Sequence, residues 1–235
     1  MNRDLGSNRQ FMKFVFIFCF SFFFHFIGCT QSTPQKQHEK TAKGQKVGGN
    51  CEGCEAIYES SVPFEKLSWV DTLPDFQEQG PKLVVSGVVY KPDGKTPAPG
   101  VVVYIYHTDQ TGNYSKKGGE KGWGLRHGYI RGWVKTNEKG EYQFYTLRPA
   151  SYPNSKIPAH IHPVIKEPDI NEYYIDEYLF DDDPLLSPDE RQRQEGRGGN
   201  AILKLEKKDG IYYGKRNIYL GKNIPDYDAA TQARF

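Results

Sequence analysis

The sequence lacks an excess of charge of either sign outside its N-terminal stretch. The whole chain carries 31 basic and 29 acidic residues. Residues 1–28 contain three of the basic residues and one of the acidic ones, so the rest of the chain holds 28 of each sign. A neutral domain without a basic helical stripe has no electrostatic footprint for a polyanion. Nucleic-acid binding is therefore excluded.

Cysteine is also scarce, with four in the chain and a single close pair, Cys51 and Cys54 in NCEGCEA. A zinc site would need two more ligands, and no second CxxC is present. A thioredoxin-like redox motif lies between a strand and a helix, which KVGGNCEGCEAIYE does not clearly supply. We predict a small structural disulfide between Cys51 and Cys54, as is usual in exported proteins, with a redox role as the alternative.

The only long apolar run is near the N-terminus, and it is short for a membrane span. Phe14–Ile27 is FVFIFCFSFFFHFI, 14 residues without charge. A membrane-spanning helix needs about 20, whereas this length suits the core of a signal peptide. The run ends in FIGCT, which resembles a bacterial lipobox. We predict that residues 1–29 are a signal peptide, that Cys29 is lipidated, and that residues 30–49 are a flexible tether.

These features predict an exported bacterial lipoprotein, anchored to a membrane and facing the periplasm or the cell surface. The alternative is an ordinary cleaved signal peptide that happens to contain Cys29.

Helix signals are few, whereas strand signals recur. Residues 82–90 and 101–109 are rich in β-branched residues, and a turn-rich loop separates them. Residues 131–147 and 201–220 each contain a turn signal between two strand-like runs, and each predicts a hairpin. The best helix signal is the short polar SPDERQRQEG, with serine and glutamate placed as a capping box. We predict an all-β fold, a single β-sandwich domain over residues 50–235.

Two histidines and a tyrosine lie close together in ASYPNSKIPAHIHPV. His160 and His162 are one residue apart, so on a strand both rings point to the same face. Two imidazoles do not complete a metal site, which needs at least three ligands. Tyr152 is a poor ligand as a phenol, but a hard trivalent ion stabilises the phenolate. The set favours ferric iron over zinc, with ordinary surface or core histidines as the alternative.

Several blocks of the sequence resemble a known family. PGVVVYIYHTDQTGNY, RGWVKTNEKGEYQFYTLRPASYP, PAHIH and YLFDDDP follow one another within residues 82–220. Together they resemble the intradiol ring-cleavage dioxygenases that act on catechol and protocatechuate, in particular the compact exported members. The resemblance implies a β-sandwich that binds one non-haem Fe(III) through Tyr114, Tyr152, His160 and His162.

The resemblance also implies an activity and its substrates. A catechol-like aromatic diol would be cleaved with O₂ to a muconate-type product. Tyr152 would be the catalytic residue, displaced by the diol and accepting its proton.

Two positions depart from the family's pattern. The family usually has an arginine three residues before the first histidine, where this chain has Ile157, and a glutamine where it has Glu177. Lys156 or Arg131 is a candidate for supplying the missing positive charge. The departures leave open a lipid-anchored β-sandwich that binds iron or catecholates without turnover. A transthyretin-like structural lipoprotein without metal is a third possibility.

Three further features of the sequence bear on function. His107 and His127 are candidates for substrate contacts, with polar loop residues as the favoured interpretation. The acidic run Asp181–Asp183 is predicted to be a solvated turn, because the alternating oxygen ligands of a calcium loop are absent. No G-x-S-x-G motif is present, so a serine hydrolase is unsupported.

Overall fold

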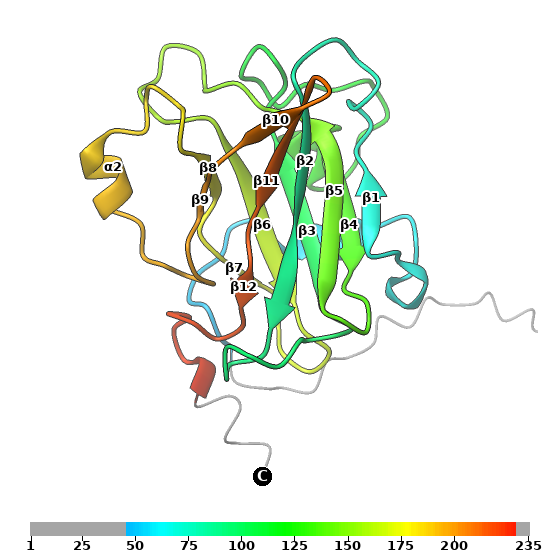
Figure 1. The fold of residues 1–235 in the computed structure, drawn as a ribbon. Helices are drawn as coiled ribbons and strands as arrows, with labels where there is room; N and C mark the ends of the chain where they lie inside the picture. The colour runs from blue at the N-terminus through cyan, green and yellow to red at the C-terminus, as the bar shows by residue number, and fades with distance from the viewer. Residues whose placement is uncertain (1–45, 229–235) are drawn as a thin grey trace, which may run out of the picture. The chain divides into compact units, whose positions relative to one another are not determined.

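Two β-sheets make up most of the fold in the computed structural model, which describes residues 46–228 (Figure 1). The first sheet contains, in spatial order, β1 (Val70–Thr72), β5 (Glu141–Leu147), β2 (Lys82–Tyr90), β11 (Ile211–Lys215) and β10 (Glu206–Lys208), with β12 (Ile218–Tyr219) also paired to β2. The second contains β4 (Arg131–Lys135), β3 (Val102–His107), β6 (His160–Lys166), β8 (Tyr178–Phe180) and β9 (Ile202–Leu203), with β7 (Tyr173–Tyr174) also paired to β6. The prediction of an all-β fold is confirmed.

Helices among the described residues are short. They are α1 (Gly124–His127), α2 (Pro188–Gln192) and the 3₁₀ helices Cys54–Glu59 and Phe64–Lys66. The start of α2 follows its predicted cap, because the Ser187 hydroxyl accepts a hydrogen bond from the Glu190 N–H at 3.2 Å. The helix ends sooner than the polar segment 187–196 suggests.

One predicted hairpin is present. β10 and β11 pair antiparallel, with Lys208 opposite Ile211. Asp209 and Gly210 between them have φ of 50° and 81°. Two left-handed residues match the right-handed twist of the flanking strands, so the Asp-Gly signal identified this turn.

The other predicted hairpin is wrong. β4 pairs with β3, whereas β5 pairs with β2 and β1 in the opposite sheet. The turn between β4 and β5 does form, and the Asn137 side chain accepts hydrogen bonds from the N–H groups of Lys139 and Glu141. The turn therefore carries the chain from one sheet to the other. A local turn signal predicts a change of direction, but the pairing partner depends on distant residues.

The main hydrophobic core lies between the two sheets and contains side chains of both. Five of them, each exposed by at most 1%, are Val85, Val103, Phe144, Ile161 and Ile165. Side chains alternate between the two faces of a strand. Because Ile161 points into this core, His160 and His162 face the other side of β6.

The segment that precedes β1 packs on that other side of the second sheet. Cys54, Ala56 and Ile57 form a second buried cluster with Val102, Tyr104 and Val164. The structure joins Cys51 to Cys54 as a disulfide at the start of this segment. The outer face of the sheet is therefore covered by residues far from it in sequence.

Part of the N-terminal prediction lies outside the described residues. This applies to the signal peptide 1–29 with Cys29, and to residues 30–45 of the predicted tether. The last residues of that tether belong to the folded domain, because Val47 is 1% exposed and its N–H bonds to the Asn171 side chain at 2.9 Å. Within residues 46–228, no helix has the length and apolar character needed to cross a membrane.

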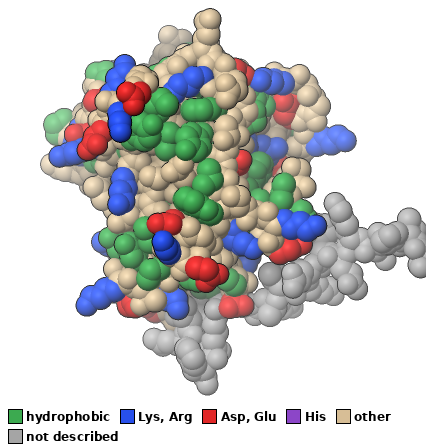
Figure 2. Space-filling view, turned by 45° about the vertical axis from the view of Figure 1, so that its right-hand side comes forward, with side chains coloured by type: hydrophobic (Ala, Val, Ile, Leu, Met, Phe, Trp, Pro, Cys, Tyr) green, Lys and Arg blue, Asp and Glu red, His purple; other side chains and the backbone are tan. Residues whose placement is uncertain are grey.

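Charged side chains of both signs are interspersed over the face of the molecule in Figure 2. Surface ion pairs among the described residues include Lys117–Glu78 and Arg126–Glu52. This mixture on the surface agrees with the even charge balance of the sequence.

Candidate active site

The structure brings the four predicted metal ligands together. Tyr114 Oη lies 2.6 Å from Tyr152 Oη and 2.8 Å from His162 Nε2. Tyr152 Oη lies 3.1 Å from His160 Nε2 and 3.4 Å from His162 Nε2. The two Nε2 atoms are 3.0 Å apart. Two phenol oxygens and two imidazole nitrogens therefore converge on one point.

The histidines come from a strand and the tyrosines from two loops. His160 and His162 lie at the start of β6, while Tyr114 follows β3 and Tyr152 follows β5. The two loops are joined through Ala150, whose C=O accepts from the Thr108 hydroxyl at 2.6 Å and whose N–H donates to the Asp109 C=O at 3.2 Å. The site is therefore assembled from three separate parts of the chain.

Gly112 allows these loops to approach each other. Its φ is +79°, and a Cβ atom at this position would lie 2.0 Å from the Ser151 carbonyl oxygen. Ser151 precedes Tyr152, and Gly112 is two residues before Tyr114. Glycine satisfies both the left-handed backbone and the close approach.

Both imidazoles are held through their other nitrogen. His160 Nδ1 lies 2.7 Å from the Pro158 carbonyl oxygen, so Nδ1–H donates and Nε2 keeps its lone pair. His162 Nδ1 faces the Glu177 carboxylate at 3.5 Å. Metal-bound histidines typically have such a partner, which fixes the tautomer and the ring orientation. Both rings thus direct Nε2 toward the phenol oxygens of Tyr114 and Tyr152.

Burial favours the neutral form of three of the four groups, His160, Tyr114 and Tyr152. Burial, with His162 nearby, lowers the pKa of His160 to about 4, so this ring is neutral at neutral pH. Burial also raises the pKa values of Tyr114 and Tyr152. The phenols therefore ionise only where a strong positive charge compensates for their desolvation.

The donor set fits a hard trivalent ion. Within residues 46–228, no group of three or more His, Cys, Asp and Glu side chains is placed to hold a metal, so a metal here depends on the tyrosines. Metal–ligand bonds of about 2.0–2.2 Å place neighbouring donors about 3 Å apart, as these atoms are. Phenolate oxygen with imidazole suits ferric iron better than a soft or divalent ion.

The family model described as "Dioxygenase" matches residues 69–197. The chain belongs to the intradiol dioxygenase family. Catechol 1,2-dioxygenase 1 of Acinetobacter lwoffii is 40% identical over 89 residues, which are 37% of this chain and 26% of that protein. The chain thus spans about a quarter of the length of this curated relative.

Solved structures share the fold. A mutant of the catechol 1,2-dioxygenase of Acinetobacter radioresistens has a TM-score of 0.51 at 16% identity, with 65% of this chain and 56% of that chain covered. The chlorocatechol 1,2-dioxygenase of Pseudomonas putida has a TM-score of 0.50 at 18% identity, with 76% and 71% covered. At these identities the likeness shows the two-sheet fold of the family.

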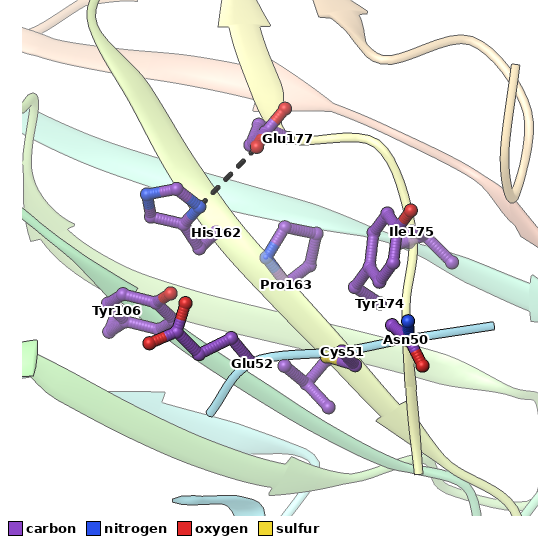
Figure 3. Close-up of a pocket in the computed structure, with 10 residues that line it drawn as sticks. Asn50, Cys51, Glu52, Tyr106, His162, Pro163, Tyr174, Ile175 and Glu177 are labelled. Atoms are coloured by element: carbon purple, nitrogen blue, oxygen red, sulfur yellow. Dashed lines mark ion pairs between the residues drawn. The ribbon is translucent and has the colours of Figure 1, made fainter. Parts of the chain in front are cut away.

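A cavity of about 210 Å³ lies beside His162 (Figure 3). Its walls include the disulfide loop at Cys51 and Glu52, the ring of Tyr106 and, from the other side, Glu177. The sequence did not single out Glu52 or Tyr106. Tyr106 sits directly opposite His162 in the β3–β6 ladder, and that register cannot be deduced from local sequence.

His107 and His127 are buried within β3 and α1, so the prediction that they are polar loop residues is wrong. His107 ends β3, is 1% exposed and has its Nε2 2.7 Å from the Thr146 hydroxyl, which in turn contacts Asp75. Burial lowers the pKa of His107, and the nearby Asp75 carboxylate opposes this effect.

His127 belongs to α1 and is 6% exposed, with Nδ1 2.9 Å from the Tyr104 hydroxyl. Its ring stacks on Tyr106 at 3.7 Å, and Tyr106 stacks on His162 at 4.6 Å. His127 therefore supports the ring behind a candidate ligand. Neither His107 nor His127 is among the residues that line the cavity.

The two departures from the family pattern have different surroundings. Ile157 is 49% exposed, and Lys156 beside it is also exposed. Arg131, the other candidate for a replacement charge, is engaged by Glu59 at 2.7 Å. Glu177 lines the cavity, and its interaction with His162 lowers the pKa of Glu177 to about 2.

The acidic run Asp181–Asp183 is only partly the predicted solvated turn. Asp181 and Asp182 form ion pairs near the surface with Arg191 and Arg148, at 2.6 and 2.8 Å. Asp183 is 7% exposed and is therefore a buried anchor rather than a solvated residue.

Replacing Asp183 by alanine is expected to destabilise the fold by about 1–3 kcal/mol, because the buried N–H of Ala159 loses its acceptor at 2.8 Å. Ala159 immediately precedes His160, so iron binding should weaken as well. Asp182→Ala is the matched control, since the Asp182 side chain is 56% exposed and an ion pair near the surface contributes about 0–1 kcal/mol. Urea unfolding measures both variants, and equal losses would contradict the anchoring role.

Proposed function

We propose that this protein is a non-haem Fe(III) intradiol dioxygenase that cleaves a catechol-like aromatic with O₂ to a muconate-type product. Membership of the family supports intradiol ring cleavage as the general activity. The observation that carries the proposal is the convergence of Tyr114, Tyr152, His160 and His162, with distances of 2.6–3.4 Å between their donor atoms.

These four residues would hold the ferric ion, which when bound supplies Lewis-acid chemistry that withdraws electron density from a catechol. The protein's own contribution is to hold the donor atoms in place. The carbonyl of Pro158 and the carboxylate of Glu177 hold the two imidazoles. Tyr152 Oη, which lies among the other three donor atoms, is the proposed acceptor of a proton from a catechol hydroxyl.

The cavity beside His162 is the proposed position of the aromatic ring or its substituent. The rings of Tyr106 and Tyr174 and the disulfide loop at Cys51 supply apolar surface there. Such ring surfaces favour contact with a flat aromatic molecule.

A second candidate function is binding of iron or a catecholate without turnover. The carboxylates of Glu52 and Glu177 at the cavity favour it, because negative groups oppose the charge that a bound diol develops. Measuring binding and product formation on one sample separates the two candidates.

We also propose that the protein is exported and anchored to a membrane by a lipid on Cys29. The 14-residue apolar run ending in FIGCT supports this. Metabolic labelling with a radioactive fatty acid tests it, with label expected on the wild-type chain and absent from Cys29→Ser.

The deciding experiment uses aerobically purified protein with its iron quantified. We expect about one iron per chain, a broad visible tyrosinate-to-iron band that shifts on adding catechol, and O₂ uptake with product. A shifted band without O₂ uptake would support binding alone. Colourless protein that takes up no iron would contradict both candidates.

A further inference from the structure

The cavity beside His162 is lined by charge of one sign. Among its lining residues, all within the described part of the chain, Glu52 and Glu177 are the charged side chains, and no lysine or arginine is present. Their side chains are 73% and 46% exposed, so both are accessible from solvent. Figure 3 shows Glu177 next to His162 and Glu52 next to Tyr106.

Two arginines lie near the cavity without lining it. Arg126 pairs with one oxygen of Glu52 and is itself 63% exposed. Arg197 stacks on the Tyr174 ring at 3.6 Å, with its side chain 3% exposed. Its Nη2 donates to the backbone carbonyls of Gly48 and Tyr174. Arg126 partly offsets Glu52, while Arg197 is enclosed behind Tyr174.

The carboxylates are therefore the acidic side chains of the cavity lining itself, with no basic Lys or Arg beside them in that lining. Carboxyl groups of glutamate are ionised at neutral pH unless their surroundings prevent it. A cavity of about 210 Å³ is several times the volume of one water, roughly 30 Å³ in the liquid, so it accommodates a short side arm of an aromatic ring.

We propose that this cavity selects catechols whose ring substituent carries a cationic ammonium group over those whose substituent carries a carboxylate, with Glu52 and Glu177 as the specificity-determining residues. The proposal rests on the proposed dioxygenase function for the orientation of the diol at the four donor atoms. The two glutamates attract an ammonium group and repel a carboxylate, and both effects favour the cationic catechol over the anionic one.

The test compares three catechols of similar size with the iron-loaded full chain. They are 4-(2-aminoethyl)catechol, 4-ethylcatechol and 3,4-dihydroxyphenylacetate, which are cationic, neutral and anionic. Dissociation constants come from the shift of the visible band, and kcat/KM from O₂ uptake. We expect both affinity and kcat/KM to decrease from the cationic to the neutral to the anionic catechol. The cationic and anionic compounds should differ by about tenfold, and this difference should shrink at about 0.5 M salt.

Variants assign the preference to residues. Glu52→Gln and Glu177→Gln should each lower the ratio of kcat/KM for the cationic catechol to kcat/KM for the anionic one by about threefold, with a matching change in the ratio of dissociation constants. Glu52→Gln is the cleaner of the two, because Glu177 also contacts His162. Glu206→Gln, an exposed carboxylate on β10 of the other sheet, is the matched control and should leave the ratio unchanged.

The proposed selectivity would be overturned if the anionic catechol binds as tightly as the cationic one. It would also be overturned if the cation-to-anion ratio is the same in Glu52→Gln, Glu177→Gln and the wild-type protein. If none of the three catechols is cleaved, the dioxygenase function fails, but the dissociation constants still decide the selectivity. If none of them binds, both proposals are overturned.

Discussion

Tyr114→Phe is expected to lose most of its bound iron and nearly all of its turnover. The Tyr114 oxygen is within 2.8 Å of both Tyr152 Oη and His162 Nε2, so its removal takes away one of the converging donors. Even changes around a metal's ligands reduce affinity by about 10–100-fold, and loss of a ligand should exceed that. We expect kcat/KM to fall at least about 1000-fold, or roughly 4 kcal/mol in the activation barrier.

Tyr213→Phe is the control for this substitution. Tyr213 lies on β11 and is 40% exposed, and the same oxygen is removed there far from the site. Iron content, the visible band and O₂ uptake are measured on both variants. If Tyr114→Phe keeps the iron content and turnover of the wild-type protein, Tyr114 is not a ligand, whatever the results for the other three candidate ligands.

Gly112→Ala is expected to disable the site without touching a ligand. The added Cβ would lie 2.0 Å from the Ser151 carbonyl oxygen, a distance that only backbone movement can relieve. That movement separates the loops of Tyr114 and Tyr152, and displacement of about 1 Å at a reacting centre lowers rates about 100-fold. We expect at least that loss in kcat/KM, with weaker iron binding.

Gly118→Ala controls for backbone strain. Gly118 lies in the same loop with φ +91°, and a Cβ there meets no atom within 4 Å. Both substitutions carry the left-handed backbone cost of about 1–2 kcal/mol, but only Gly112→Ala adds the clash. Thermal unfolding and iron titration together separate strain from clash, and equal iron binding by the two variants would contradict our explanation.

Local patterns predicted much of the fold because strands and tight turns depend on near neighbours. The β-branched run at 82–90 became β2, and Asp209–Gly210 became the β10–β11 turn. The same reasoning failed for β4 and β5, which join different sheets. Their pairing is decided by packing of both sheets around residues such as Phe144, and a turn motif carries no information about that.

The four candidate ligands were identified from sequence because three of them lie within eleven residues and their order matches a known family. The residues that surround these ligands could not be identified in the same way. Glu52 meets the cavity only because the disulfide segment docks on the second sheet, and Tyr106 meets His162 only through the strand register. His107 was misjudged since its position at a strand end suggested solvent, whereas it is enclosed by Thr146 and Asp75.

The docking of the segment around Cys51 on the second sheet has a consequence for how new specificities can arise. The donors on β6 and the two tyrosine loops come from residues 114–162, while one wall of the cavity is supplied from about sixty residues earlier. Substitutions in that short disulfide-closed stretch can alter which molecule is admitted while the donor atoms stay in place. The part of the selectivity that depends on Glu52 can thus change independently of the donor atoms, and exchanging residues 50–54 between relatives is a direct way to vary it.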